Sequence, residues 1–290
     1  MASSLLNIYK KKLQNKHVQE LFRGSVIAFS LRILGFVTGY LFTFLISIYY
    51  GAKGVGIYSL SFTVLSISGM IGALGMQTSI LRFVGQFSAE NNFHKVRLLY
   101  KKILTLSVPV SVLLSLILFL FSDAIAVIFF HNETLAVAFK IISLSLPFFV
   151  VNSVNVELIR GMKIIKFSEY LRSANTTFFS VILIFLLHFF IRNDVLPITV
   201  FAASIGLTFL LSTSYLTKKL HAFPMQDIDS LPLGKLLMTS LPMMMTAFSS
   251  LLMGNIATIM LGIYETTAQV GIYAISLKIA TATSFILIQS

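Results

Sequence analysis

The chain has 290 residues, of which 57% are hydrophobic and only 11% are charged. A soluble domain carries about 25% charged residues. With a mean hydropathy of +0.90, this chain has too little polar surface to cover a water-facing globule, so we expect its solvent to be lipid. Cysteine is absent, which excludes a disulfide framework and thiolate metal sites. The net charge of +12 alone would suggest nucleic acid as a partner. The distribution of the basic residues along the chain indicates another cause.

Eight stretches are apolar and long enough to cross ~30 Å of hydrocarbon as helices, which takes about 20 residues each. The chain is therefore predicted to be an all-α integral membrane protein, a polytopic helical bundle of about eight transmembrane helices. The stretches lie near 24–49, 55–80, 103–122, 135–155, 173–191, 196–216, 237–262 and 270–290.

Lysine and arginine residues alternate between the predicted loops. Such an asymmetry sets orientation, because basic loops stay cytoplasmic. We therefore expect a cytoplasmic N-terminus and eight crossings. The basic residues would also meet anionic membrane lipids, which accounts for the charge without nucleic acid. Seventeen of the 22 basic residues fall in 1–23, 81–102, 156–172 and 217–236, whereas the opposite loops hold only Lys53 and Arg192.

A four-residue motif occurs twice in the sequence. Val55-Gly56-Ile57-Tyr58 recurs 215 residues later as Val270-Gly271-Ile272-Tyr273. Six helices separate the copies, so both run in the same direction, as in the parallel repeats of transporter halves. Because the second copy supplies only two helices, we expect a C-terminally truncated chain. The predicted domains are a cytoplasmic amphipathic segment (1–23, or a frayed basic tail), a six-helix N-terminal lobe (24–216), a cytoplasmic linker (217–236) and the incomplete start of a C-terminal lobe (237–290).

Arg32 is the first candidate site residue, because a charge inside a span defaults to a functional hypothesis. At 100° per residue it shares a helix face with the small or polar residues Gly35, Gly39 and Thr43. These leave room for a ligand or for a neighbouring helix. A guanidinium binds phosphate oxygens bidentately, although Arg32 could instead snorkel to the interface. We expect no acidic residue at comparable depth to neutralise it.

The second helix carries a matching polar stripe, which either contacts substrate or packs against other helices. Lys278 corresponds by the repeat offset to Thr63 on that stripe, so Arg32 and Lys278 are predicted to face one central cavity from opposite lobes. A neutral or snorkelling lysine is the other interpretation. The stripe consists of Ser59, Thr63, Ser66, Ala73 and Gln77.

Asn152 and Asn155 share a face of the fourth helix. Their amides could bond sugar hydroxyls, or more simply bond neighbouring helices. Enzyme chemistry finds little support, since the five histidines are scattered without metal-ligand spacing and no phosphate-binding glycine loop is present. We therefore expect no catalytic residue, metal or cofactor. The acidic residues all fall in predicted loops or at helix ends, which disfavours a cation exporter.

Several short runs, in order along the chain, resemble the polysaccharide transporter family, the Wzx-type flippases of the MOP exporter superfamily. They are Leu31-Arg32-Ile33-Leu34-Gly35-Phe36, Tyr50-Gly51-Ala52, Val55-Gly56-Ile57-Tyr58-Ser59-Leu60, Leu241-Pro242, Ile259-Met260-Leu261-Gly262 and Val270-Gly271-Ile272-Tyr273-Ala274 with Lys278.

This resemblance implies a flippase of the bacterial inner membrane. Its substrate would be an undecaprenyl-pyrophosphate oligosaccharide for O-antigen or another surface polysaccharide, moved by alternating access between two lobes. A polysaccharide polymerase and a chain-length regulator are implied partners. The Arg-Ile-Leu-Gly-Phe run is also similar to the lipid II flippase branch, where an arginine of the first helix lines the substrate cavity. A MATE-like exporter of drugs or organic cations, from the same superfamily, is the alternative.

Overall fold

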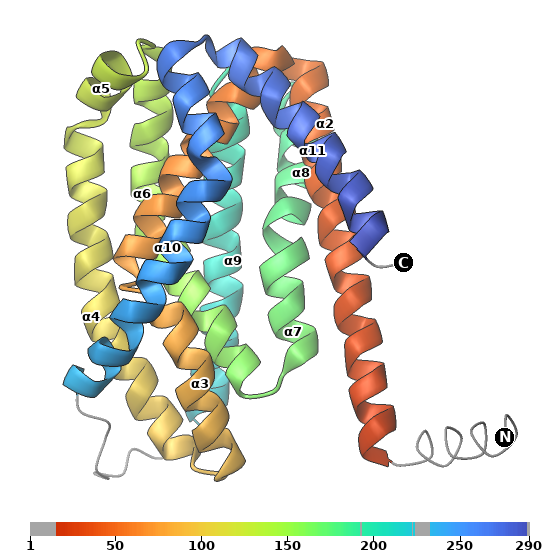
Figure 1. Cartoon of the computed structure of the whole chain (residues 1–290), viewed down its shortest axis with the longest axis vertical. Helices are drawn as coiled ribbons and strands as arrows, with labels where there is room; N and C mark the ends of the chain where they lie inside the picture. Colours follow the sequence, from red (N-terminus) through yellow and green to blue (C-terminus); the bar gives the residue numbers. More distant parts are fainter. Residues whose placement is uncertain (1–15, 192, 222, 224–232, 289–290) are drawn as a thin grey trace, which may run out of the picture.

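The computed structural model describes residues 16–191, 193–221, 223 and 233–288, and within these ranges it is all-helical. Most helices run roughly along one axis (Figure 1). The helices, including two π-helical segments η1 and η2, are α2 (Lys16–Gly72), α3 (Met76–Ala89), α4 (Phe93–Leu120), α5 (Ser122–Ala124), η1 (Ile125–Phe129), α6 (Thr134–Gly161), α7 (Ile165–Glu169), η2 (Tyr170–Asn175), α8 (Thr176–Leu187), α9 (Leu196–His221), α10 (Leu233–Tyr264) and α11 (Thr267–Ile288).

The long helix α2 is two helical arms joined at Gly51. This glycine has φ 65° and ψ −169°, a conformation that residues with a Cβ rarely adopt. The chain reverses there with no other loop residue between the arms (Figure 1). The connection between the predicted stretches 24–49 and 55–80 is therefore reduced to a single non-helical position. A second turn at Gly75, also with positive φ, separates α2 from α3.

Within the described residues, six helical stretches are long and apolar enough to cross a membrane, and the first of them, Gly24–Gly72, contains both arms of α2. The all-α multi-pass prediction is confirmed. Several boundaries differ from those predicted. The second arm ends at Gly72 instead of near residue 80, α4 begins at Phe93 instead of near 103, and the fifth predicted stretch begins at Ile165 instead of near 173.

The basic segments gather at one end of the bundle. The start of α2, α3, α7 and the start of α10 lie at the lower end in Figure 1, and α5 lies at the upper end. The described parts of the four predicted basic segments therefore lie at the same end of the bundle (Figure 1). Residues 1–15 of the predicted amphipathic segment and 224–232 of the predicted linker lie outside the described residues; residues 16–23 continue directly into α2.

Two apolar clusters form the core. The first joins α2, α6, α8 and α9 around Phe42, Leu60 and Phe139, and the second joins α3, α4, α6 and the end of α9 around Met76, Ile103 and Ile159. The helix α6 contributes to both clusters and packs against α4 on one side and α9 on the other. It is therefore the helix that joins the two clusters.

The two repeat copies cross each other at their glycines. A Cβ on Gly56 would overlap the backbone oxygen of Thr267, and a Cβ on Gly271 would overlap that of Ala52. Thr267 and Ala52 are themselves 215 residues apart in the sequence, so the contact is symmetric with respect to the repeat. The start of α11 thus packs backbone to backbone against the start of the second α2 arm.

The helix α10 runs antiparallel to that arm along a seam of small and polar residues. Thr63 of that arm donates a hydrogen bond to Asn255 Oδ1 at 3.1 Å. Beyond the arm, the hydroxyl of Ser79 on α3 lies 2.6 Å from that of Ser240 on α10. Such contacts are favoured in lipid, where apolar surface alone gives helices no reason to associate.

The glycine crossing can be tested by adding one methyl group. We expect Gly56→Ala or Gly271→Ala to lower the free energy of unfolding by about 2 kcal/mol, because the backbones must separate and overpacking costs ~1–3 kcal/mol. Denaturant unfolding in detergent micelles measures this. Gly206→Ala on α9 is the matched control, since nothing lies within 4 Å of the added Cβ. Equal stability of all three variants would contradict the close crossing.

Candidate functional site

Arg32 forms an ion pair with Glu169 between the first arm of α2 and the end of α7. Its Nε donates to Glu169 Oε2 and its Nη2 to Glu169 Oε1, both at 3.2 Å. This is the two-bond geometry in which guanidinium and carboxylate match best. The expectation that Arg32 lacks an acidic partner is therefore wrong. Glu169 falls in a predicted loop, whereas the spanning stretch begins at Ile165 and includes it.

The pair lies at one end of a close seam between two parallel helices. Further along, a Cβ on Gly35 would overlap the backbone oxygen of Ser173. The next contact joins the hydroxyls of Thr38 and Thr177 at 2.8 Å. The small residues beside Arg32 thus admit the neighbouring helix at Gly35.

A second charged group surrounds Glu157, one turn before the end of α6. Arg172 of η2 approaches it at 3.3 Å and Arg160 at 3.6 Å. Arg172 falls in a predicted loop, but it lies in the π-helical segment η2 within the stretch Ile165–Leu187. Within the described ranges, no group of three or more histidine or acidic residues lies in a metal-binding arrangement.

In both groups the carboxylate is covered and a guanidinium is exposed. The side chain of Glu169 is 3% exposed and that of Arg32 55%, while Glu157 is 15% and Arg172 48% exposed. The carboxylates compensate the charge and fix the position of the arginines. The surface that remains accessible is positive.

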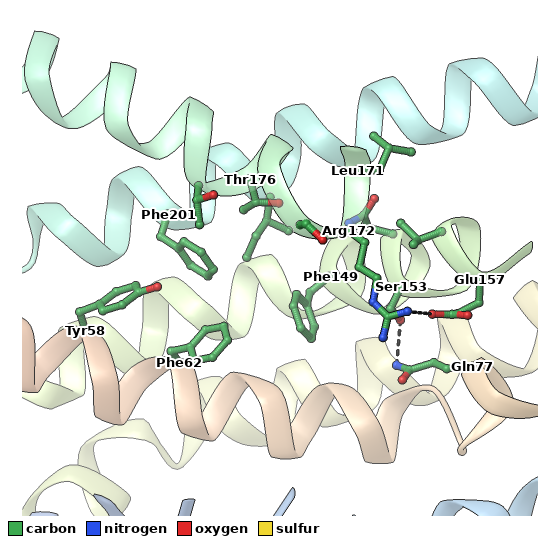
Figure 2. Close-up of a pocket in the computed structure, with 15 residues that line it drawn as sticks. Tyr58, Phe62, Gln77, Phe149, Ser153, Glu157, Leu171, Arg172, Thr176 and Phe201 are labelled. Atoms are coloured by element: carbon green, nitrogen blue, oxygen red, sulfur yellow. Dashed lines mark hydrogen bonds and ion pairs between the residues drawn. The ribbon is translucent and has the colours of Figure 1, made fainter. Parts of the chain in front are cut away.

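A cavity of about 360 Å³ adjoins this region inside the first lobe. Figure 2 shows aromatic rings at one end and polar side chains at the other, with Arg172 reaching Glu157 beside Gln77. Its volume lies in the range of ~300–1,000 Å³ that is typical of small-molecule sites. Its lining comprises Tyr58, Phe62, Gln77, Phe149, Asn152, Ser153, Val156, Glu157, Leu171, Arg172, Ser173, Thr176, Thr177, Phe201 and Ile205.

Two of the predicted site residues line this cavity. The amide of Gln77 donates to Ser153 Oγ at 2.9 Å. Asn152 Oδ1 is buried without a hydrogen-bond partner among the described residues. A buried acceptor without a partner is uncommon in folded proteins, so Asn152 has unused capacity to bind a hydroxyl or amide group that enters the cavity.

Lys278 reaches the same face of α2 as Arg32. Its Nζ donates to the backbone oxygen of Gly39 at 3.1 Å and to the hydroxyl of Thr43. The ammonium also lies 5.7 Å from the centre of the Tyr40 ring, within the distance of a cation–π contact. The ammonium therefore lies on the stripe that contains Arg32, with oxygen atoms of α2 as its neighbours.

The other predicted residues lie outside the cavity. Asn155 is fully buried and joins three helices, because it accepts from Tyr100 and donates to Ser212 and Thr213. Thr63 bonds Asn255. Ser66 donates to the backbone oxygen of Phe62 on its own helix, and Ser59 is half-buried.

Sequence reasoning missed Glu169, Arg172 and the aromatic end of the cavity. The available signal was the run from Ile165 onward, which can be read as the first turns of a helix. The π-helical turns of η2 leave no comparable pattern in the sequence, and they determine which side chains of this helix face α2 and which face α6.

The fold and this site describe a multi-pass membrane bundle in which the two copies of the sequence repeat pack against each other. Residues 11–290 match the polysaccharide biosynthesis protein family, and the chain belongs to that family. This confirms the resemblance to the polysaccharide transporter branch of the MOP superfamily. Among curated protein sequences, none matches the chain.

Two solved structures share the fold. The MATE multidrug transporter DinF-BH, solved in complex with a ligand, superposes with a TM-score of 0.62 at 17% identity, over 88% of this chain. A structure named only as protein A gives a TM-score of 0.61 at 18% identity, also over 88% of this chain. The chain spans 60% of the length of each of these proteins.

The ion pair between Arg32 and Glu169 gives a stability prediction. We expect Glu169→Gln to lower the free energy of unfolding by about 1–2 kcal/mol, less than the ~3–5 kcal/mol for a fully buried pair, because Arg32 is half exposed. Arg32→Gln should cost less in the Glu169→Gln background than in the parent. Denaturant unfolding of the four proteins measures the coupling. Glu90→Gln, at the exposed end of α3, should change little; purely additive costs at 32 and 169 would contradict the pairing.

Proposed function

We propose that this chain forms part of a flippase, which moves an undecaprenyl-pyrophosphate oligosaccharide across the cytoplasmic membrane for surface polysaccharide export. Family membership supports the polysaccharide assignment. The repeat-related crossing of Gly56 and Gly271 supports two lobes that work by alternating access. The proposed orientation has the basic end of the bundle, with the start of α2, in the cytoplasm.

The observation that carries the proposal is the exposure of the guanidiniums over covered carboxylates. Arg32 and Arg172 are both about half exposed, and their carboxylate partners lie beneath them. A site built this way attracts anions and repels cations. Pyrophosphate suits it, because a guanidinium can bind two phosphate oxygens at once.

The cavity beside Arg172 supports a saccharide as the second part of the substrate. Amides such as those of Gln77 and Asn152 both donate and accept hydrogen bonds, as sugar hydroxyls do. The aromatic rings of Tyr58, Phe62 and Phe149 offer flat apolar surfaces for the carbon faces of a sugar ring. We assign part of the glycan to this cavity and the pyrophosphate to the arginines, of which Arg172 lines the cavity.

The alternative, a MATE-like exporter of drugs or organic cations, is favoured by one finding. Glu157 and Glu169 both lie within stretches that can span a membrane, although the sequence analysis places Glu169 in a loop. A cation exporter needs carboxylates that are accessible to its substrate or coupling ion. Because both carboxylates here are covered and paired with arginine, the flippase remains the better interpretation.

Transport should depend on the two exposed arginines. In a strain that lacks its own flippase and carries this protein, we expect Arg32→Gln and Arg172→Gln each to reduce surface polysaccharide at least tenfold, because each removes a charge-assisted phosphate contact. Membrane levels of each variant, measured by immunoblot, separate lost transport from lost folding. Lys53→Gln is the control, since Lys53 pairs with Asp194 near the bend of α2 at Gly51 and away from the site. Unchanged export in both arginine variants would refute the cationic site.

A binding assay separates the two candidate functions. The purified protein in detergent should bind a pyrophosphate-linked oligosaccharide lipid, and Arg172→Gln should weaken that binding at least tenfold. Ethidium, a fluorescent organic cation of the kind that the alternative function requires, should bind neither protein. Ethidium binding that is lost in Glu157→Gln, without binding of the saccharide lipid, would replace the flippase with the cation exporter.

A further inference from the structure

A second, smaller pocket lies on the outside of the first lobe, away from the cavity just described. It has a volume of about 210 Å³ and opens between the first turns of α4 and the last turns of α9. Both helix ends lie at the basic end of the bundle (Figure 1). Its lining residues are Arg97, Tyr100, Lys101, Leu104, Thr217, Leu220 and His221.

Two of the lining residues, Arg97 and Lys101, are basic and lie one turn apart on α4. In the described part of the chain, Arg97, Lys101 and His221 take part in none of the ion pairs. One guanidinium nitrogen of Arg97 donates to the backbone oxygen of Phe223, which holds the side chain beside the pocket. Two adjacent basic side chains that are not paired with carboxylates create a local positive potential.

The lining of the pocket is mostly apolar, and one of its side chains is anchored inside the bundle. The hydroxyl of Tyr100, which is 9% exposed, bonds Asn155 of α6, so this side chain is fixed to α6. Leu104 and Leu220 form apolar walls. A rigid pocket of this kind needs little reorganisation to bind a ligand.

Apolar surface continues from the pocket toward the middle of the membrane. Val112 lies on the same face of α4 as Lys101, and Leu210 lies on the same face of α9 as Thr217, at a period of 3.6 residues. These side chains are 50% and 59% exposed. A ligand with a charged head in the pocket can therefore lay hydrocarbon chains along both helices.

We propose that this pocket is a binding site for an anionic diacyl phospholipid of the adjacent leaflet. Arg97 and Lys101 bind the lipid phosphate, the hydroxyl of Thr217 bonds a phosphate or glycerol oxygen, and the acyl chains lie along α4 and α9. Basic pockets between spanning helices at the headgroup level are a general mode of anionic lipid recognition. This site is independent of the proposed transport function, because none of its lining residues lines the saccharide cavity.

Native mass spectrometry of the purified protein tests the proposal directly. The protein in neutral detergent is titrated with phosphatidylglycerol and, separately, with phosphatidylcholine. We expect one phosphatidylglycerol to bind at least tenfold more tightly than phosphatidylcholine. The Arg97→Gln/Lys101→Gln variant should lose that preference, and Lys101→Gln alone, which leaves the Arg97 contact to Phe223 intact, should weaken it in part.

A charge-matched control distinguishes the pocket from the general basic surface. Lys218 and Lys219 lie on the same turn of α9 but do not line the pocket, so Lys218→Gln/Lys219→Gln should keep the preference. Equal loss in both double variants would overturn the proposal in favour of diffuse surface charge. Inorganic phosphate and glycerol phosphate are titrated in the same way, to distinguish a soluble phosphate ligand from a lipid. Tight binding of either one would also overturn the lipid assignment.

Discussion

The structure of the first lobe depends on how it accommodates charge within spanning helices. An arginine in hydrocarbon is costly unless it is paired or reaches water. Here Arg32 is paired with Glu169, and the pair requires α2 and the α7–η2 helix to approach closely. Gly35 permits that approach, because a Cβ there would meet the backbone of Ser173. Arg32 and Gly35 therefore act together. The charge of Arg32 is compensated only if the two helices lie close, and Gly35 allows them to do so.

The need to accommodate charge in lipid also explains which features could be predicted from the sequence and which could not. Hydropathy was sufficient for the all-α, multi-pass character of the chain, because in lipid every backbone polar group must be satisfied within helices. The partner of Arg32 was out of reach, since Glu169 lies within a stretch that begins at Ile165 and not near the predicted residue 173. Local helix boundaries are poorly encoded near an interface, where polar residues suit both a loop and a helix end.

The repeat shows a different limit of sequence reasoning. The spacing of 215 residues predicted that two helix pairs run in the same direction, but not that the copies touch. In the structure Gly56 packs at the backbone of Thr267, and Gly271 packs at that of Ala52. Contacts between repeats are therefore reciprocal, as expected around a two-fold axis. The glycines of the repeated motif have a physical role that the pattern alone does not reveal.

Under the proposed function, Lys278 provides a second cation along α2, at a distance from Arg32. Its ammonium binds Gly39 and Thr43, which follow Arg32 by seven and eleven residues on the same face of α2. At a rise of 1.5 Å per residue this separation is about 10–16 Å along the helix. Arg32 belongs to the first lobe, whereas Lys278 comes from α11 and arrives with the second. An anion moving along α2 would thus meet a cation fixed within one lobe and then a cation whose position depends on how the two lobes are packed. Relative motion of the lobes would therefore change the surroundings of Lys278 while leaving the pair of Arg32 and Glu169 intact.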